Sequence, residues 1–156
     1  MRFISKTLAV VSAVFLLTAC DAMNGSGGAD GSGSATPGTQ SDLSQNVGDR
    51  VFFDYNSSAL TSEGEATLTK QVAWLKQYSS INVTVEGHAD ERGTREFNIA
   101  LGERRASVTK RFLTSKGVAS SRVSTISYGK ERPAVVGSDD ASWAQNRRAV
   151  TVVSNQ

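Results

Sequence analysis

The sequence EGHADERGTREFNIALGERRA, residues 86–106, joins a predicted strand to a predicted helix. Apolar and polar residues alternate just before it, at 81–85, as in a strand with one buried face. Its second half has apolar residues at helical intervals, and Gly117 suits the C-terminal cap of a helix from about Glu96 to Lys116. The stretch therefore predicts a strand, a loop and a helix in succession, with charged side chains concentrated where the loop meets the helix.

Further strands and helices are indicated on both sides of this stretch. They are a short strand at 51–53, a helix after Ser62 and Glu65, which have capping-box spacing, a strand at 123–128, a short helix capped by Asp139 or Asp140 and running to Gln145, and a strand at 149–153. Strands that alternate with helices predict a layered α/β fold, with the helices covering one face of the sheet. The pattern does not give the order of the strands.

The first 19 residues have the layout of a signal peptide. Arg2 and Lys6 make a basic start, an apolar run follows at 8–17, and small residues precede Cys20. The run is too short to span a bilayer as a mature helix. The sequence LLTAC looks like the lipobox of bacterial lipoproteins, and by that resemblance Cys20 becomes the first mature residue and carries acyl chains. Ordinary signal cleavage beside an unmodified Cys20 is the alternative.

Residues 20–46 are rich in Gly, Ser, Thr, Asp and Asn and contain almost no large apolar side chain. Such a composition cannot bury enough surface to offset its ordering entropy, so we predict a lipidated Cys20 followed by a flexible linker. A flexible chain of this length spans roughly 25 to 30 Å. The compact domain is then predicted at residues 47–156.

The charge balance argues against a nucleic-acid partner. The chain has 17 Lys and Arg against 15 Asp and Glu, and removal of a signal peptide that holds Arg2 and Lys6 leaves 15 of each sign. A nucleic-acid partner normally needs a clear basic excess. The single cysteine also excludes an intramolecular disulfide.

Arg105 is the most unusual residue of the predicted helix. It lies seven positions after Asn98, so the two side chains fall within about 20° of one helical face. Apolar residues share that face, and a buried guanidinium needs an anion because uncompensated charge is costly. The anion can be an internal carboxylate, Asp54 or Asp90, or it can belong to a ligand, with Asp90 then taking the ligand's cationic end. Snorkelling to solvent is the remaining alternative.

His88 is weighed as a catalytic residue because H-x-D is compatible with general acid–base work, a catalytic triad or zinc binding. It is the only histidine of the chain, and no G-x-S-x-G or H-E-x-x-H motif accompanies it. We therefore predict a hydrogen-bonding role at the end of the strand, no enzyme activity, no metal site and no cofactor. A hydrolase that uses His88 with Asp90 or Glu86 is the alternative function.

Other large side chains receive structural roles. Trp74 and Trp143 are predicted as core or groove-wall residues. Arg147 and Arg148 are predicted as a solvated start of the last strand.

The quoted stretch, with VFFDY upstream and SYGKERPA and NRRAV downstream, closely resembles the OmpA-like domain family and its peptidoglycan-associated lipoproteins. The resemblance covers about residues 47–155 and is specific, because Asp90, Asn98 and Arg105 occur together at the family's spacing. It implies the OmpA-like fold, an α+β sandwich in the order βαβαβ(α)β whose helices pack on a mixed four-stranded sheet.

The resemblance also implies a ligand and a site. The family binds the stem peptide of peptidoglycan non-covalently through its meso-diaminopimelate residue, whose end carries an ammonium and a carboxylate. By analogy Asp90 receives the ammonium, Arg105 receives the carboxylate, and Asn98 orders the loop and the helix start. The other implied ligand-binding residues are Phe53 and Asp54, which border the groove, and Ala89, Leu101 and Gly102, which line it, with His88 as their neighbour.

The implied partners are peptidoglycan, the outer membrane through the lipid anchor, and TolB with the other Tol proteins of the Tol–Pal system. The implied function is to link the outer membrane to the cell wall, which supports envelope integrity and cell division. We expect the protein in the outer membrane, facing the periplasm. Asp21 departs from this expectation, because an Asp directly after the lipidated cysteine resembles an inner-membrane retention signal of enteric bacteria.

Overall fold

The computed structural model describes residues 35–154 of the 156-residue chain. The predictions for the signal peptide, for Cys20 and Asp21, and for the linker up to residue 34 lie outside the described residues. The elements follow one another as α1 (Gln40–Asp42), the π-helical turn η1 (Leu43–Val47), β1 (Arg50–Phe52), α2 (Ser62–Gln77), β2 (Val83–His88), α3 (Arg95–Ser115), the 3-10 turn η2 (Ser120–Arg122), β3 (Val123–Gly129), α4 (Asp140–Asn146) and β4 (Arg148–Val153).

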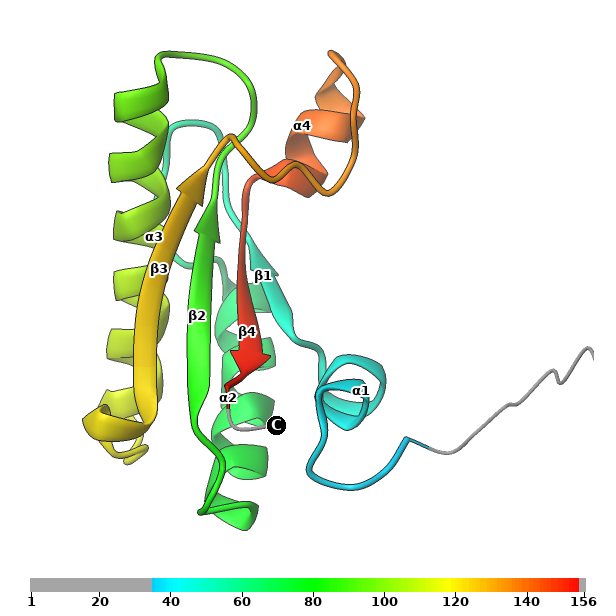
Figure 1. Cartoon of the computed structure of the whole chain (residues 1–156), viewed down its shortest axis with the longest axis vertical. Helices are drawn as coiled ribbons and strands as arrows, with labels where there is room; N and C mark the ends of the chain where they lie inside the picture. Colours follow the sequence, from blue (N-terminus) through cyan, green and yellow to red (C-terminus); the bar gives the residue numbers. More distant parts are fainter. Residues whose placement is uncertain (1–34, 155–156) are drawn as a thin grey trace, which may run out of the picture. The chain divides into compact units, whose positions relative to one another are not determined.

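The four strands form one mixed sheet in the order β1-β4-β2-β3. β4 runs antiparallel to both of its neighbours, whereas β2 and β3 are parallel. Helices α2 and α3 lie on one face of this sheet, and α4 stands near the end of the sheet at which β2 and β3 finish (Figure 1). The α+β sandwich in the order βαβαβ(α)β is confirmed.

The core lies between the sheet and the two long helices. In β2, Val83 and Val85 face the helices and are buried, as the alternation predicted, whereas Thr84 and Glu86 on the other face are half-buried. Burying one such aliphatic side chain contributes roughly 1.5 to 3 kcal/mol relative to leaving it exposed. The helices supply Leu68, Val72 and Leu75 from α2, and Ala106 and Leu113 from α3.

Threonine side chains start both long helices. The Thr61 hydroxyl accepts a hydrogen bond from the Gly64 amide at 3.1 Å, and the Thr94 hydroxyl accepts one from the Phe97 amide at 3.2 Å. These bonds satisfy backbone donors that the helix itself leaves unpaired. The predicted capping box of Ser62 and Glu65 is wrong, because Thr61 is the N-cap of α2 and the third helical residue is then Gly64, which has no side chain to complete a box.

Two glycines set the distance between α3 and β2. A Cβ atom on Gly87 would overlap the Gly102 carbonyl group, and a Cβ atom on Gly102 would lie 2.8 Å from the Gly87 carbonyl oxygen. No side chain fits at either position, so the backbones of the helix and the strand touch. This contact places the start of α3 against the end of β2.

The linker prediction is wrong for residues 40–46. They form α1 and most of η1, and the Leu43 side chain is fully buried in the core. The Asp42 carboxylate accepts hydrogen bonds from the Trp74 indole and the Gly38 amide, each at 2.8 Å. Trp74 is distant from Asp42 in the sequence. The polar composition of the segment therefore did not indicate that it packs against the domain.

We expect Asp42→Ala to lower the free energy of unfolding by about 1 to 3 kcal/mol, because the buried Trp74 indole would lose its acceptor. Hydrogen bonds from Asn46, Trp74 and Gly38 hold the pKa of Asp42 below its ordinary value. The carboxylate therefore stabilises the fold above the pKa it has in the unfolded chain, and this stability is lost as the pH falls through its folded pKa. Urea unfolding at pH 7 and at pH 3 measures both effects.

The control is Glu63→Gln, which changes an exposed carboxylate of α2. We expect this variant to unfold close to the parent at both pH values. A loss of stability in Asp42→Ala no larger than in Glu63→Gln would show that Asp42 does not hold the N-terminal segment.

Candidate ligand-binding site

A small pocket opens where β2 ends and α3 begins. Its volume is about 100 Å³. The residues of the expected site that line it are Asp90, Asn98, Leu101 and Arg105, together with Tyr55, Arg92 and Phe97. The close contact of α3 with β2 therefore brings half of the eight predicted ligand-binding residues to one pocket.

Arg105 is completely buried, and its guanidinium binds backbone carbonyls. Nε donates to Ser57 O at 2.9 Å, Nη1 to His88 O at 2.7 Å and Nη2 to Asp54 O at 3.1 Å. Burial lowers the pKa of Arg105 to about 10, and the charge of Asp90 opposes this shift. The guanidinium is therefore charged at neutral pH. Because the Arg105 side chain is buried, it does not snorkel to solvent. Its guanidinium binds the backbone carbonyl of Asp54 and does not pair with the Asp54 carboxylate.

The Asp90 carboxylate is buried and carries cationic partners of its own. Arg92 donates from Nη2 to Oδ2 at 2.7 Å and from Nε to Oδ1 at 3.2 Å, and Arg147 Nη1 lies 3.6 Å from Oδ2. Burial alone would raise the pKa of Asp90, but the hydrogen bonds and charge of Arg92, with the charge of Arg147, hold the pKa below its ordinary value. Asp90 is therefore ionised, and it does not pair with the guanidinium on the other side of the pocket.

The Arg92 guanidinium lies between two aromatic rings. Its Cζ atom is 4.1 Å from the centroid of the Tyr55 ring and 4.0 Å from that of Trp143. The Trp143 indole donates to the Glu91 carboxylate at 3.0 Å, which orients the ring. Sequence reasoning gave no role to Arg92, whose only signal was a cation two residues after Asp90.

Asn98 holds the loop that carries these charges. It is 1% exposed, and its side-chain amide donates to the Arg92 carbonyl at 3.0 Å. The Thr94 cap lies between them and starts α3. This geometry fits the expected role of Asn98 in ordering the loop and the helix start.

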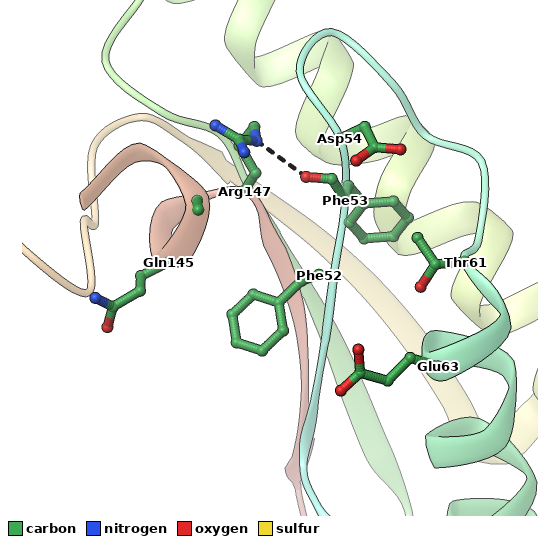
Figure 2. Close-up of a pocket in the computed structure, with 8 residues that line it drawn as sticks. Phe52, Phe53, Asp54, Thr61, Glu63, Gln145 and Arg147 are labelled. Carbon is green, nitrogen blue, oxygen red and sulfur yellow. Dashed lines mark hydrogen bonds between the residues drawn. The ribbon is translucent and has the colours of Figure 1, made fainter. Parts of the chain in front are cut away.

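Phe53 and Asp54 lie beside a second hollow of about 430 Å³ (Figure 2). Phe52 and Glu63 line it as well. The Arg147 Nε donates to the Phe53 carbonyl at 2.9 Å, drawn as the dashed line in Figure 2. Nη1 of the same guanidinium lies 3.6 Å from the carboxylate of Asp90, which lines the small pocket.

Ala89 and Gly102 do not line the small pocket. The Ala89 amide donates to Gly129 O at 2.8 Å, and the residue borders a third hollow of about 200 Å³. Gly102 packs against Gly87 and has no room to face a ligand. The expectation that both line one groove with Arg105 does not match their positions.

His88 is buried, but its ring makes no hydrogen bond within the described part of the chain. Its carbonyl accepts from Arg105, so the bond predicted for this strand end is made by the backbone and not by the imidazole. Nε2 lies 3.6 Å from the Glu86 carboxylate, and the ring packs against Tyr128. Burial, with the charge of Arg148, lowers the pKa of His88 to about 4, so the imidazole is neutral at pH 7.

The prediction of a solvated start to β4 is wrong. Arg148 is 7% exposed and donates to the carbonyls of Asn146 and Arg132. The Arg147 side chain is 16% exposed. Burial lowers the pKa of Arg148.

Within residues 35–154, no group of His, Cys, Asp and Glu is arranged to hold a metal ion. None of the helices in that range is both long and apolar enough to cross a membrane.

Comparison with known proteins identifies one family and several relatives of similar sequence. Residues 52–147 match the OmpA family. The chain is 58% identical over 127 residues to a protein from Mesorhizobium japonicum named peptidoglycan-associated lipoprotein, an overlap of 81% of this chain and 76% of the relative. It is 40% identical over 146 residues to a protein of the same name from Haemophilus influenzae, an overlap of 93% and 95%.

Solved structures agree with this result. The crystal structure of the peptidoglycan-associated lipoprotein from Burkholderia pseudomallei matches with a TM-score of 0.68 at 36% identity, over 72% of this chain and all of that chain. The C-terminal domain of Helicobacter pylori MotB matches with a TM-score of 0.65 over 69% of this chain and 85% of that chain. Its identity of 19% shows a shared fold alone.

We expect the stability of the chain to fall as the pH drops from 6.5 to about 4, in part through His88. Its ordinary pKa is 6.5 and its folded pKa is about 4, so in this window the unfolded chain binds a proton that the folded chain does not. The slope from one such group is at most about 1.4 kcal/mol per pH unit. His88→Phe keeps a buried ring without a titrating nitrogen and should flatten the curve, which urea unfolding across the window measures. An unchanged slope would contradict the lowered pKa.

Proposed function

The chain belongs to the OmpA family, and we propose that it binds peptidoglycan through the small pocket that Asp90 and Arg105 line. The ligand is the stem peptide, recognised at the end of its meso-diaminopimelate residue. That end group carries one ammonium and one carboxylate. Similarity to proteins named peptidoglycan-associated lipoprotein supports this choice of polymer.

One observation carries the proposal: a buried carboxylate and a buried guanidinium line one pocket without pairing with each other. Asp90 is 4% exposed and Arg105 is 0% exposed. Three of the five N–H donors of the guanidinium bind carbonyls, which leaves two for a ligand carboxylate. A zwitterionic end group supplies the opposite charge to each side of such a pocket.

Helix α3 adds a favourable potential for an anion. It has 21 residues, and its first turn borders the pocket at Phe97 and Asn98. The positive end of a helix macrodipole favours negative groups within about one turn. The carboxylate of the ligand therefore gains from the helix as well as from Arg105.

We propose binding without turnover. His88, which a hydrolase would use, has a buried ring and a pKa lowered to about 4 by burial. Its carbonyl, not its imidazole, contacts Arg105. No observation on residues 35–154 favours the hydrolase alternative.

We further propose that acyl chains on Cys20 anchor the protein in the outer membrane, with the domain in the periplasm. The LLTAC sequence and the names of the relatives support this. Two or more acyl chains give stable anchoring. The protein then links the outer membrane to the wall, with TolB and the other Tol proteins as partners, and so supports envelope integrity and cell division.

We expect Asp90→Asn to reduce co-sedimentation of the full-length chain with purified sacculi, in detergent, by about tenfold or more. The variant keeps the size of the side chain and removes the charge that holds the ammonium. A charge-assisted hydrogen bond contributes about 1.5 to 3 kcal/mol, and 1.4 kcal/mol is tenfold in affinity. The control is Glu131→Gln, an exposed carboxylate that pairs with Arg95 outside the pocket. Equal sedimentation of the two folded variants would refute the site.

Arg105→Ala is not a suitable test of the site. It would leave the carbonyls of Asp54, Ser57 and His88 without their donor. Each unsatisfied buried group costs about 1 to 3 kcal/mol. Loss of sacculus binding in that variant would therefore not separate recognition from unfolding.

A further inference from the structure

The Asp90 carboxylate is occupied in the free protein. Arg92 binds it through Nη2 at 2.7 Å, through Nε at 3.2 Å and through its backbone amide at 3.1 Å. Arg147 Nη1 lies 3.6 Å from the same carboxylate. A carboxylate offers about four acceptor sites, and Arg92 fills three of them, so a ligand ammonium that donates more than one hydrogen bond to Asp90 must displace the Arg92 guanidinium.

The groups around the Arg92 guanidinium form what we call the Arg92 cage, defined as Tyr55, Asp90 and Trp143. The two rings lie 4.1 and 4.0 Å from Cζ, and the carboxylate closes a third side. Aromatic faces attract any cation that lies over them, including an alkylammonium. The cage therefore has the chemistry of a general ammonium site and not of a site specific for guanidinium.

Trp143 is held on helix α4, whereas the Arg92 side chain lies on a loop and reaches solvent. Trp143 is oriented by the Glu91 carboxylate, and α4, which carries it, is tied down where the Asn146 side chain accepts from the Ala134 amide at 2.7 Å. The Asp90 side chain is 5% exposed, but that of Arg92 is 30% exposed on a loop. A long side chain that already reaches solvent can rotate outward without disturbing the core.

The small volume of the pocket also indicates that Arg92 moves when a ligand binds. Its volume is about 100 Å³, and Arg92 lines it. Sites for small ligands usually measure about 300 to 1,000 Å³. Outward rotation of the Arg92 side chain would enlarge the pocket and uncover the Asp90 carboxylate in one movement.

We propose that the Arg92 cage is an ammonium-binding subsite, filled by Arg92 in the free protein and by the ammonium of the ligand in the complex. This inference rests on the proposed peptidoglycan-binding function. Arg92 is a self-ligand that the diamino acid displaces, and Tyr55 and Trp143 then contact the ligand. Displacement subtracts the Arg92 contacts from the affinity, which keeps the attachment reversible.

The first test compares binding of the tripeptide L-Ala-γ-D-Glu-meso-diaminopimelate to the full-length chain and its variants by calorimetry. Arg92→Ala removes the competitor, so we expect about tenfold tighter binding. Arg132→Ala is the matched control, because Arg132 also stacks on a ring, Tyr128 at 3.8 Å, but lies outside the pocket. We expect no change in this control. Unchanged or weaker binding in Arg92→Ala would overturn the proposal.

The second test removes a wall of the cage in a chain that no longer carries the competitor. Trp143→Leu in the Arg92→Ala background should weaken tripeptide binding about fivefold, because one aromatic face is lost. Nitrogen-15 NMR of the parent should show the Arg92 Nε–H and Trp143 Nε1–H signals shifting when the tripeptide is added. Full affinity in the double variant, or an unmoved Arg92 signal at saturation, would overturn the cage.

These outcomes separate the inference from the function on which it rests. If neither the parent nor Arg92→Ala binds the tripeptide, the peptidoglycan-binding function fails. If the parent binds and Arg92→Ala shows no gain, the function stands and the displacement of Arg92 fails. Thermal unfolding of each variant confirms that a change in binding is not a loss of fold.

Discussion

The buried guanidinium of Arg105 is the interaction on which the site depends. It binds the carbonyls of Asp54 and Ser57 after β1 and of His88 at the end of β2, so one side chain of α3 fixes the backbone of two other segments. Burial of a charge without a hydrogen-bonded carboxylate is costly. Here three carbonyl dipoles, with the Asp90 charge nearby, offset the cost and keep the group ionised. The loops that form the pocket are therefore held by the same residue that would bind the ligand.

The backbone contact of α3 with β2 makes this arrangement possible. Only glycine at 87 and 102 lets the helix approach closely enough, and a Cβ atom at either position would collide with the facing residue. The close approach brings Asn98, Leu101 and Arg105 to the end of the strand where Asp90 begins the loop. Helix α3 thus serves both packing and recognition. Gly102 contributes to the packing, although it does not line the small pocket.

Sequence periodicity predicted much of this fold and part of the site. The alternation that ends at Val85 and the helical phase of Arg105 were sufficient to place both side chains on the buried side, and Gly117, with φ of 98°, ends α3 as predicted. Pattern does not identify partners, so the carbonyls bound by Arg105 were not predicted. Arg92 was missed because its role depends on Trp143, which α4 brings from a distant part of the chain.

The docked N-terminal segment lies at one end of the sheet and the small pocket lies at the other. The Gln40 side chain accepts from the Val153 amide at 2.8 Å, at the end of β4, whereas Arg147, just before β4, approaches Asp90. The six residues of β4 span roughly 17 to 20 Å, so the proposed tether attaches at the opposite end of the sheet from the pocket. A pull between membrane and wall would then run along the strands. Ladder hydrogen bonds lie perpendicular to antiparallel strands, so such a pull loads many of them together. The segment that carries this load into the sheet is held by the buried Leu43 side chain and by the hydrogen bonds of Asp42 and Gln40.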